Sequence, residues 1–173
     1  KPSGLSFVEV EHTGCGQKSE EEAAVVNWMV DSLLEQEWTD RDGARRKLTL
    51  DDILVVTPYN MQVACLEGVL PAGARVGTVD KFQGQEAPVV IVSMTTSSAE
   101  EMPRDHEFLF SRNRLNVAVS RAQGLAIVIA SPRLLEVPCK AIQQMKLVNA
   151  LCWAKAYADR AVADDQMAGQ RAA

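Results

Sequence analysis

The sequence lacks the features of a membrane-spanning or exported chain. No apolar run approaches the length that crosses a bilayer, and the first residues show no signal-peptide pattern. The four cysteines, Cys15, Cys65, Cys139 and Cys152, are widely spaced, with no C-x-x-C pair and no neighbouring pair of histidines. We therefore expect reduced thiols in a cytoplasmic protein, with no disulfide framework, no metal site and no membrane partner.

An excess of positive charge is also missing. The 18 lysines and arginines are outnumbered by 23 aspartates and glutamates, which gives a formal net charge of −5. A protein that binds nucleic acid unaided usually carries a basic surface, so this balance argues against that class. The charge is uneven, however, because acidic clusters such as Glu20–Glu22 lie early, whereas most of the later basic residues lie among few acids. A protein that holds nucleic acid through loop amides and a second domain remains compatible with this charge.

A phosphate-binding P-loop is absent as well. The segment Gly14–Ser19 lies between a predicted strand and a predicted helix, which is where a P-loop would stand. That pattern needs glycine immediately before its lysine and again five residues earlier, but Gln17 and His12 occupy these positions. Three glutamates at the helix start also oppose phosphate. Ser19 and Glu22 instead match the S-x-x-E pattern of a capping box.

The stretch Val76–Met94 is the most informative part of the chain. Its second half, Val89–Met94, is a continuous apolar run typical of a buried strand in a parallel sheet. The preceding loop, Lys81–Glu86, contains a glycine, two amides and a carboxylate, and it follows another predicted strand. Ligands of open α/β sheets bind beyond the carboxyl ends of strands, so we expect a binding loop here. Gly84 would let the backbone approach a ligand, and Glu86 could accept from a ribose hydroxyl. The alternative is a simple polar turn.

This stretch resembles motif V of the superfamily 1 helicases, whose pattern is T-V-D-x-F-Q-G-x-E-x-x-x-V-I-x-S. Two further blocks agree in order and spacing, since Ile53–Gln62 is similar to the motif IV region and Asn113–Ala122 is similar to motif VI. The resemblance covers roughly residues 5 to 135 and is to the second, C-terminal RecA-like domain of a helicase motor. It implies an α/β fold of three layers, in which helices cover both faces of a mostly parallel sheet that lacks its own P-loop.

The resemblance also implies a nucleotide site shared with another domain. ATP with Mg²⁺ would be bound mainly by the missing N-terminal RecA-like domain. The second arginine of motif VI, Arg121, would act as an arginine finger against the γ-phosphate, because its forked donors neutralise charge on the transferring group. Arg114, Gly84 and Glu86 would complete this chain's part of the nucleotide site. The usual alternative for an arginine on a helix is a solvated surface charge.

The same resemblance implies that loops following the strands hold single-stranded DNA or RNA. The candidate residues are Thr57, Tyr59, Asn60, Thr78, Val79 and Asp80. Thr57 and Asn60 have short polar side chains that suit hydrogen bonds to phosphate or sugar, and Tyr59 could stack on a base. The alternative that stays open is that Tyr59 packs on the helix that follows.

Two polar segments are predicted to be surface loops. Trp38–Leu50 contains a turn at Asp42 and Gly43 and a basic run, and we expect it to be solvated. Thr95–His106 is polar and contains a proline, and we expect a mobile surface loop there.

The sequence thus predicts the C-terminal motor domain of an ATP-dependent helicase or translocase, inactive as an isolated fragment. We divide the chain into a helicase-type domain over residues 1–158 and a tail over 159–173 that frays. The start at Lys1, without methionine, suggests a piece of a longer protein. A looser resemblance to the C-terminal part of bacterial proteins that join a RecB-like nuclease to such a motor implies a fused nuclease domain as a further partner. The alternatives are a non-catalytic interaction module that kept the fold and a free-standing nucleotide-binding enzyme.

Overall fold

The fold was analysed in a computed structural model. The chain is described over residues 3–82, 84–98, 100–101, 112–136 and 142–171. Side chains are described within these ranges except at residues 112–114, 142–144, 146–147 and 164–171.

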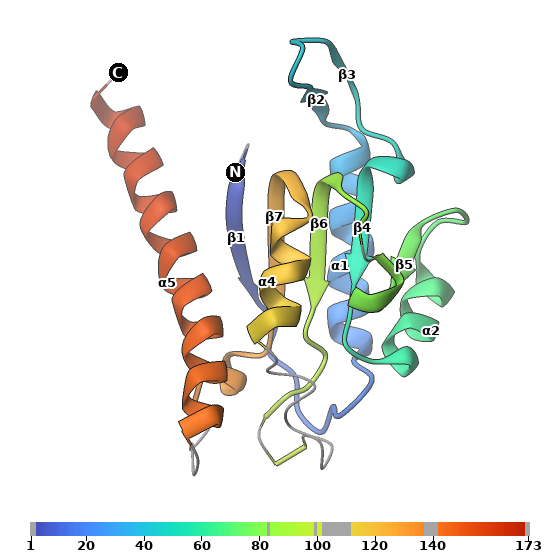
Figure 1. The fold of residues 1–173 in the computed structure, drawn as a ribbon, viewed down its shortest axis with the longest axis vertical. Helices are drawn as coiled ribbons and strands as arrows, with labels where there is room; N and C mark the ends of the chain where they lie inside the picture. Colours follow the sequence, from blue (N-terminus) through green and yellow to red (C-terminus); the bar gives the residue numbers. More distant parts are fainter. Residues whose placement is uncertain (1–2, 83, 99, 102–111, 137–141, 172–173) are drawn as a thin grey trace.

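A five-stranded sheet with the strand order β1-β7-β6-β4-β5 forms the centre of the molecule, and all neighbouring strands are parallel (Figure 1). The strands are β1 (Gly4–Glu9), β4 (Ile53–Val56), β5 (Arg75–Gly77), β6 (Ala87–Ser93) and β7 (Ala122–Ala130). Every residue of β4 and β6 is buried, as a parallel sheet covered on both faces requires. Because the strands run the same way, the sheet has an amino edge, where strands begin, and a carboxyl edge, where they end.

Helices cover both faces of this sheet, with α1 behind the strands and α4 in front of them in Figure 1. The helices are α1 (Glu20–Leu34), α2 (Asn60–Val69), α4 (Arg112–Ser120) and α5 (Ile142–Arg171), with short 3₁₀ turns η1 (Leu50–Asp52), η2 (Val79–Phe82) and η3 (Pro132–Glu136). Side chains of α1 and α2 share one core cluster with Ile53 and Val55, whereas those of α4 and α5 share the other with Leu54 and Val56. This alternation follows from the two-residue period of a strand. The predicted RecA-like α/β fold of three layers is confirmed.

A small hairpin stands at the amino edge of the sheet, the upper edge in Figure 1. It consists of β2 (Glu37–Thr39) and β3 (Arg45–Lys47), which are antiparallel. The predicted solvation is confirmed for residues 39–47, which are all exposed, but the segment is a hairpin rather than an irregular loop. The sequence pattern missed that Trp38 packs against the core cluster behind the sheet, and that the basic run of β3 is paired with carboxylates of Glu35, Glu37 and Asp52.

The last helix, α5, continues through the predicted tail. It extends as one helix to Arg171, so no break marks the boundary proposed at residue 159, and fraying of the tail stays a prediction. Neither α5 nor any other helix within the described ranges is both long and apolar enough to cross a membrane.

Candidate functional site

Arg121 and the loop before β6 meet at the amino edge. Arg121 stands between the last turn of α4 and the first residue of β7. Its backbone N–H donates to the carbonyl of Ala118 (3.2 Å), and its carbonyl accepts from the N–H of Ala87 (3.0 Å). Because Ala87 begins β6 and directly follows Glu86, this second bond fixes Arg121 beside the end of the loop. The structure thus brings Arg121 and Glu86 to one edge of the sheet.

The loop residues beside Arg121 are exposed. Gly84 has a φ of +80°, a left-handed conformation that favours glycine, and the space around it is open. Among the described residues, the Glu86 side chain is contacted by the amide of Gln123, whose Nε2 donates to Glu86 Oε2 at 3.4 Å. A bond of that length is weak, so most acceptor capacity of the Glu86 carboxylate faces solvent.

The guanidinium of Arg121 is held without a counter-charge from the described residues. Its Nε is buried and has no hydrogen-bond partner among them. Two other arginines already have hydrogen-bond partners. Arg46 makes two bonds of 2.6 Å to Asp52, and Arg75 donates to the Gln85 side chain at 2.7 Å. Arg121 is half-buried and has no ion pair among the described residues, so an anionic ligand would supply the counter-charge that its guanidinium lacks. The other predicted arginine, Arg114, belongs to α4, but its side chain lies outside the described set.

The prediction that the whole loop lies at the carboxyl edge is wrong. Thr78 follows the carboxyl end of β5, but η2 then carries the chain back across one face of the sheet. Lys81 Nζ donates to the carbonyl of Val76 (2.7 Å), and the side chain of Gln85 accepts from Arg75, the first residue of β5. These bonds return Gly84–Glu86 to the amino edge. Residue types around a loop do not reveal such a reversal.

The predicted nucleic-acid residues after β4 differ in accessibility. Thr57 is fully buried, and its hydroxyl lies 3.1 Å from that of Thr95. Tyr59 is only 8 % exposed, packs in the front core cluster and accepts a bond from the Thr96 hydroxyl (3.4 Å). Burial raises the pKa of the Tyr59 phenol above its usual value. Tyr59 is therefore packed in the core, but in the front cluster with α4 and α5, whereas the apolar side chains of α2, the helix that follows, belong to the other cluster. Asn60 is exposed at the start of α2.

The candidates after β5 lie partly on the surface. Thr78 and Val79 are half-buried, and Val79 packs against the front core cluster, whereas Asp80 is exposed. Asn60 and Thr78 are thus the accessible neutral polar candidates beyond the carboxyl ends of two adjacent strands, Thr78 directly after β5 and Asn60 at the start of α2, four residues after the end of β4.

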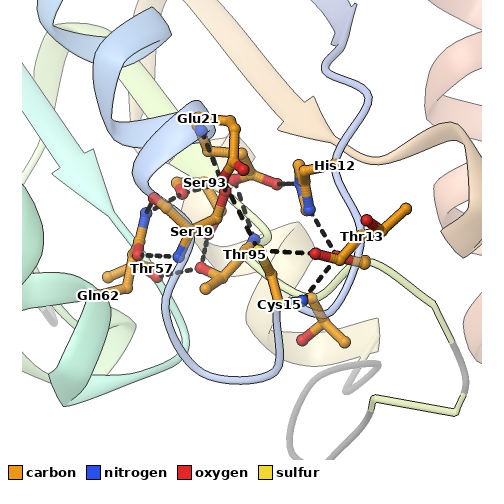
Figure 2. A network of polar contacts seen from close by, with 12 residues as sticks. His12, Thr13, Cys15, Ser19, Glu21, Thr57, Gln62, Ser93 and Thr95 are labelled. Carbon is orange, nitrogen blue, oxygen red and sulfur yellow. Dashed lines mark hydrogen bonds and ion pairs between the residues drawn. The ribbon is translucent and has the colours of Figure 1, made fainter.

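Sequence reasoning missed a buried polar network at the carboxyl edge, shown in Figure 2. His12 Nε2 donates to Glu22 Oε1 (3.0 Å), and His12 Nδ1 lies 2.7 Å from the hydroxyl of Ser97. The side chains of His12 and Glu22 are both completely buried. A buried carboxylate needs such partners, since an unpaired charge in the interior is strongly destabilising.

Glu22 completes this network with its second oxygen. Glu22 Oε2 accepts from the hydroxyl of Ser93 (2.6 Å) and from the backbone N–H of Thr95 (2.9 Å). Thr95 has a φ of +74°, a left-handed conformation that is rare for a β-branched residue, and the bond to Glu22 helps to hold it. Thr95–Ser98 are buried, so the surface-loop prediction is wrong for these residues, and 102–106 lie outside the described ranges.

The predicted capping box is therefore only half formed. Ser19 caps α1, and its side chain accepts from the N–H of Glu22 (3.1 Å). The Glu22 carboxylate does not return to Ser19, because it serves the buried network. The N–H of Ser19 donates instead to Gln62 Oε1 (2.8 Å), and Gln62 Nε2 donates to the carbonyl of Ser19 (3.0 Å), which ties α2 to the start of α1.

Ser97, His12 and Glu22 have the residue types and distances of a hydrolase triad, but they are placed as a structural clamp. Ser97 is completely buried, and its Oγ already accepts from the N–H of Cys15 (3.0 Å). A substrate carbonyl has no route to that oxygen, so nucleophilic catalysis is excluded in this conformation. Within the part of the chain that the structure describes, no cluster of His, Cys, Asp and Glu is arranged to hold a metal ion.

A family of AAA domains, AAA_12, matches residues 8–133, well over half of the chain. The chain is 38 % identical over 104 residues to the probable RNA helicase armi of Drosophila melanogaster, covering 54 % of this chain and 8 % of that protein. It is 39 % identical over 96 residues to the human RNA helicase Mov10l1, covering 51 % and 8 %. It is 37 % identical over 111 residues to the DNA polymerase alpha-associated DNA helicase A of Schizosaccharomyces pombe, covering 62 % and 15 %. The chain therefore spans only a small part of these relatives.

Proposed function

Because the chain belongs to the AAA_12 family of AAA domains, and its relatives include RNA and DNA helicases, we propose that it is the second, C-terminal RecA-like domain of an ATP-dependent superfamily 1 helicase or translocase. In this proposal the amino edge faces ATP and Mg²⁺ held mainly by an N-terminal RecA-like domain of the same protein. That domain supplies the P-loop, whose pattern this chain lacks.

The observation that carries the proposal is the position of two residues at the amino edge. Arg121 has no ion-pair partner among the described residues, and the carboxylate of Glu86 is exposed. Arg121 would approach the γ-phosphate and stabilise charge on the transferring phosphoryl group. Glu86 would accept from a ribose hydroxyl, and Gly84 would let the backbone come close to the nucleotide. Arg114 would assist from α4. Closure of the two domains on ATP would complete the site, and hydrolysis would reopen it.

Single-stranded DNA or RNA would cross the carboxyl edge. Asn60 and Thr78 would hydrogen-bond its backbone, with Val79 and Asp80 beside them. Thr57 and Tyr59 are buried and would act by supporting these loops from beneath. A cytoplasmic location and a fused RecB-like nuclease domain complete the proposal, the latter on the looser resemblance of the sequence.

The test is nucleic-acid-stimulated ATP hydrolysis by a polypeptide that joins this chain to its N-terminal RecA-like domain. Arg121→Ala should lower kcat by about 10³-fold or more, the effect of removing an arginine finger. Arg133→Ala is the matched control, because Arg133 is exposed and lies at a loose 3.9 Å from Glu100. The isolated chain should hydrolyse ATP negligibly. Unchanged kcat in Arg121→Ala would instead favour the non-catalytic interaction module.

A further inference from the structure

The strand that follows Arg121 contains an irregularity at its second and third residues. Ala87 of β6 pairs with Ala122 of β7, but the next paired residues are Val89 and Leu125. Two steps along β6 thus correspond to three along β7, so β7 carries an extra residue at Gln123 and Gly124. Such a bulge bends a strand locally and redirects the side chains beside it.

The indole of Trp38 covers this bulge. A Cβ added to Gly124 would lie 2.5 Å from Cζ3 and 3.0 Å from Cη2 of Trp38, which is too close for any side chain. Gly124 does not have a left-handed φ, so steric exclusion by the indole, with the carbonyl of Pro88 at 3.3 Å, is what requires glycine there. The sheet and the hairpin therefore fit one another at this point.

The hairpin that carries Trp38 is itself bonded to η1, which directly precedes β4, the strand on the other side of β6 from β7. Trp38 pairs across the hairpin with Arg46. The guanidinium of Arg46 makes two bonds of 2.6 Å to Asp52, which is buried in η1, directly before β4. Asp52 also accepts from the N–H of Thr49 (2.8 Å). The position of the indole is thus fixed from two sides, by its contact with Gly124 and by the bonds between Arg46 and Asp52.

The covered bulge is next to both partners of the proposed nucleotide site: it contacts Glu86 and lies two residues after Arg121 in the sequence. Gln123, within the bulge, donates to Glu86. Arg121 immediately precedes the strand that contains the bulge, and its carbonyl is fixed by the N–H of Ala87. A shift of the bulge would therefore move Gln123 away from Glu86 and change the direction of Arg121.

We propose that Trp38 is a positioning residue for Arg121 and Glu86: by filling the space over Gly124, it holds the β7 bulge in the register that aims both side chains at the nucleotide. This inference rests on the proposed function. It assigns the hairpin a role in the catalytic geometry that its exposed basic residues, paired with Glu35, Glu37 and Asp52, do not suggest.

The catalytic test uses the polypeptide of two RecA-like domains. A displacement of about 1 Å at a reacting group can cost about 10²-fold, so Trp38→Ala should lower kcat by between about tenfold and 10²-fold. The KM for ATP should change less than kcat, because most contacts to ATP belong to the other domain. Trp38→Phe should recover most of the activity by restoring a flat ring. Trp28→Ala is the control, since Trp28 is 66 % exposed on α1.

A second test asks whether Trp38 and Gly124 act through direct contact, using urea unfolding of this chain. Gly124→Ala should lower the unfolding midpoint when Trp38 is present, because its methyl group meets the indole. In the Trp38→Ala background the same substitution should leave the midpoint unchanged or raise it. Equal effects in both backgrounds would overturn the contact on which the inference rests.

The outcomes also separate this inference from the proposed function. If Arg121→Ala abolishes turnover while Trp38→Ala and Gly124→Ala leave kcat unchanged, the positioning role is wrong and the motor function stands. If Arg121→Ala has no effect, the proposed function fails first. A fall in the stability of Trp38→Ala with unchanged kcat would show a purely structural tryptophan and would overturn the positioning role.

Discussion

At the carboxyl edge, the carboxylate of Glu22 accepts hydrogen bonds through both oxygens inside the protein, whereas at the amino edge the exposed carboxylate of Glu86 has, among the described side chains, one weak contact with an exposed glutamine. The basic partners differ in the same way, since His12 is bonded through both ring nitrogens, whereas the buried Nε of Arg121 has no partner within the described ranges. A polar group whose hydrogen bonds are all made within the protein contributes to stability, whereas a charged group with few protein partners retains donors or acceptors for a ligand. Substitutions at the two edges should therefore have separable effects.

The largest effect on stability should come from the buried clamp. Glu22→Ala leaves His12 and the N–H of Thr95 without their acceptor, and each buried hydrogen-bonding group left without its partner typically costs about 1–3 kcal/mol. Urea unfolding of this chain measures the change. Glu20→Ala, at an exposed position of the same helix turn, should leave the midpoint nearly unchanged. If the Glu22→Ala chain is as stable as wild type, the polar network at the carboxyl edge does not stabilise the fold, and the contrast with the amino edge is wrong.

Glu86→Ala should have the converse effect at the amino edge. Loss of a charge-assisted hydrogen bond of about 1.5–3 kcal/mol to the ribose should raise the KM for ATP of the two-domain protein by roughly tenfold or more. The unfolding midpoint of this chain should not change, because Glu86 is exposed. Glu67→Ala, exposed on α2, is the control. A fall in stability with unchanged KM would place Glu86 with the structural residues.

The anchor of the hairpin predicts a dependence of stability on acid. Hydrogen bonds from Arg46, opposed by burial, lower the pKa of Asp52 to about 2. The folded-state pKa lies below the unfolded value, so this stability is present above about pH 4 and is lost as the pH falls toward 2. The loss should be on the order of 1–2 kcal/mol, after allowance for solvent screening of the exposed arginine. Asp52→Asn should remove this part of the pH dependence in unfolding experiments between pH 5 and pH 2 (about the range of the transition).

The smallest predicted effect concerns nucleic acid. Asn60→Ala removes one exposed hydrogen-bonding group, and a net loss of about 1 kcal/mol should weaken binding of a single-stranded oligonucleotide to the two-domain protein by about fivefold. Fluorescence anisotropy with DNA and RNA oligonucleotides measures this change. Met61→Ala, at the exposed neighbouring position, should leave the affinity unchanged. Equal weakening by both substitutions would argue for a general change in α2 rather than a contact at Asn60.

Local patterns predicted much of this architecture. The apolar run at Val89–Met94 indicated a buried parallel strand, and β6 occupies most of it. The order of motifs predicted that Arg121 and Glu86 lie near one another, although neither residue's role is tested by the fold. The reversal through η2 was not predictable, because it depends on bonds such as Lys81 to Val76 that no periodicity encodes.

Contacts between distant residues account for the other errors. His12 and Ser97 are 85 positions apart, so a lone histidine after a strand gave no sign of the clamp. The short polar residues that follow β6 were a usable signal, since hydroxyls directly after a buried strand often satisfy buried charges. The contact of Trp38 could not be predicted, because Trp38 lies in a polar segment and its partner, Gly124, has no side chain that would contribute to a sequence pattern.

The most direct test of the central claim is a structure of the two-domain protein with an ATP transition-state analogue. The measurement is the distance from the Arg121 guanidinium to the group that replaces the γ-phosphate. The account predicts a hydrogen bond of about 2.7–3.1 Å, with Glu86 facing the ribose. A nucleotide bound against the carboxyl edge, or an Arg121 side chain directed away from it, would contradict the account.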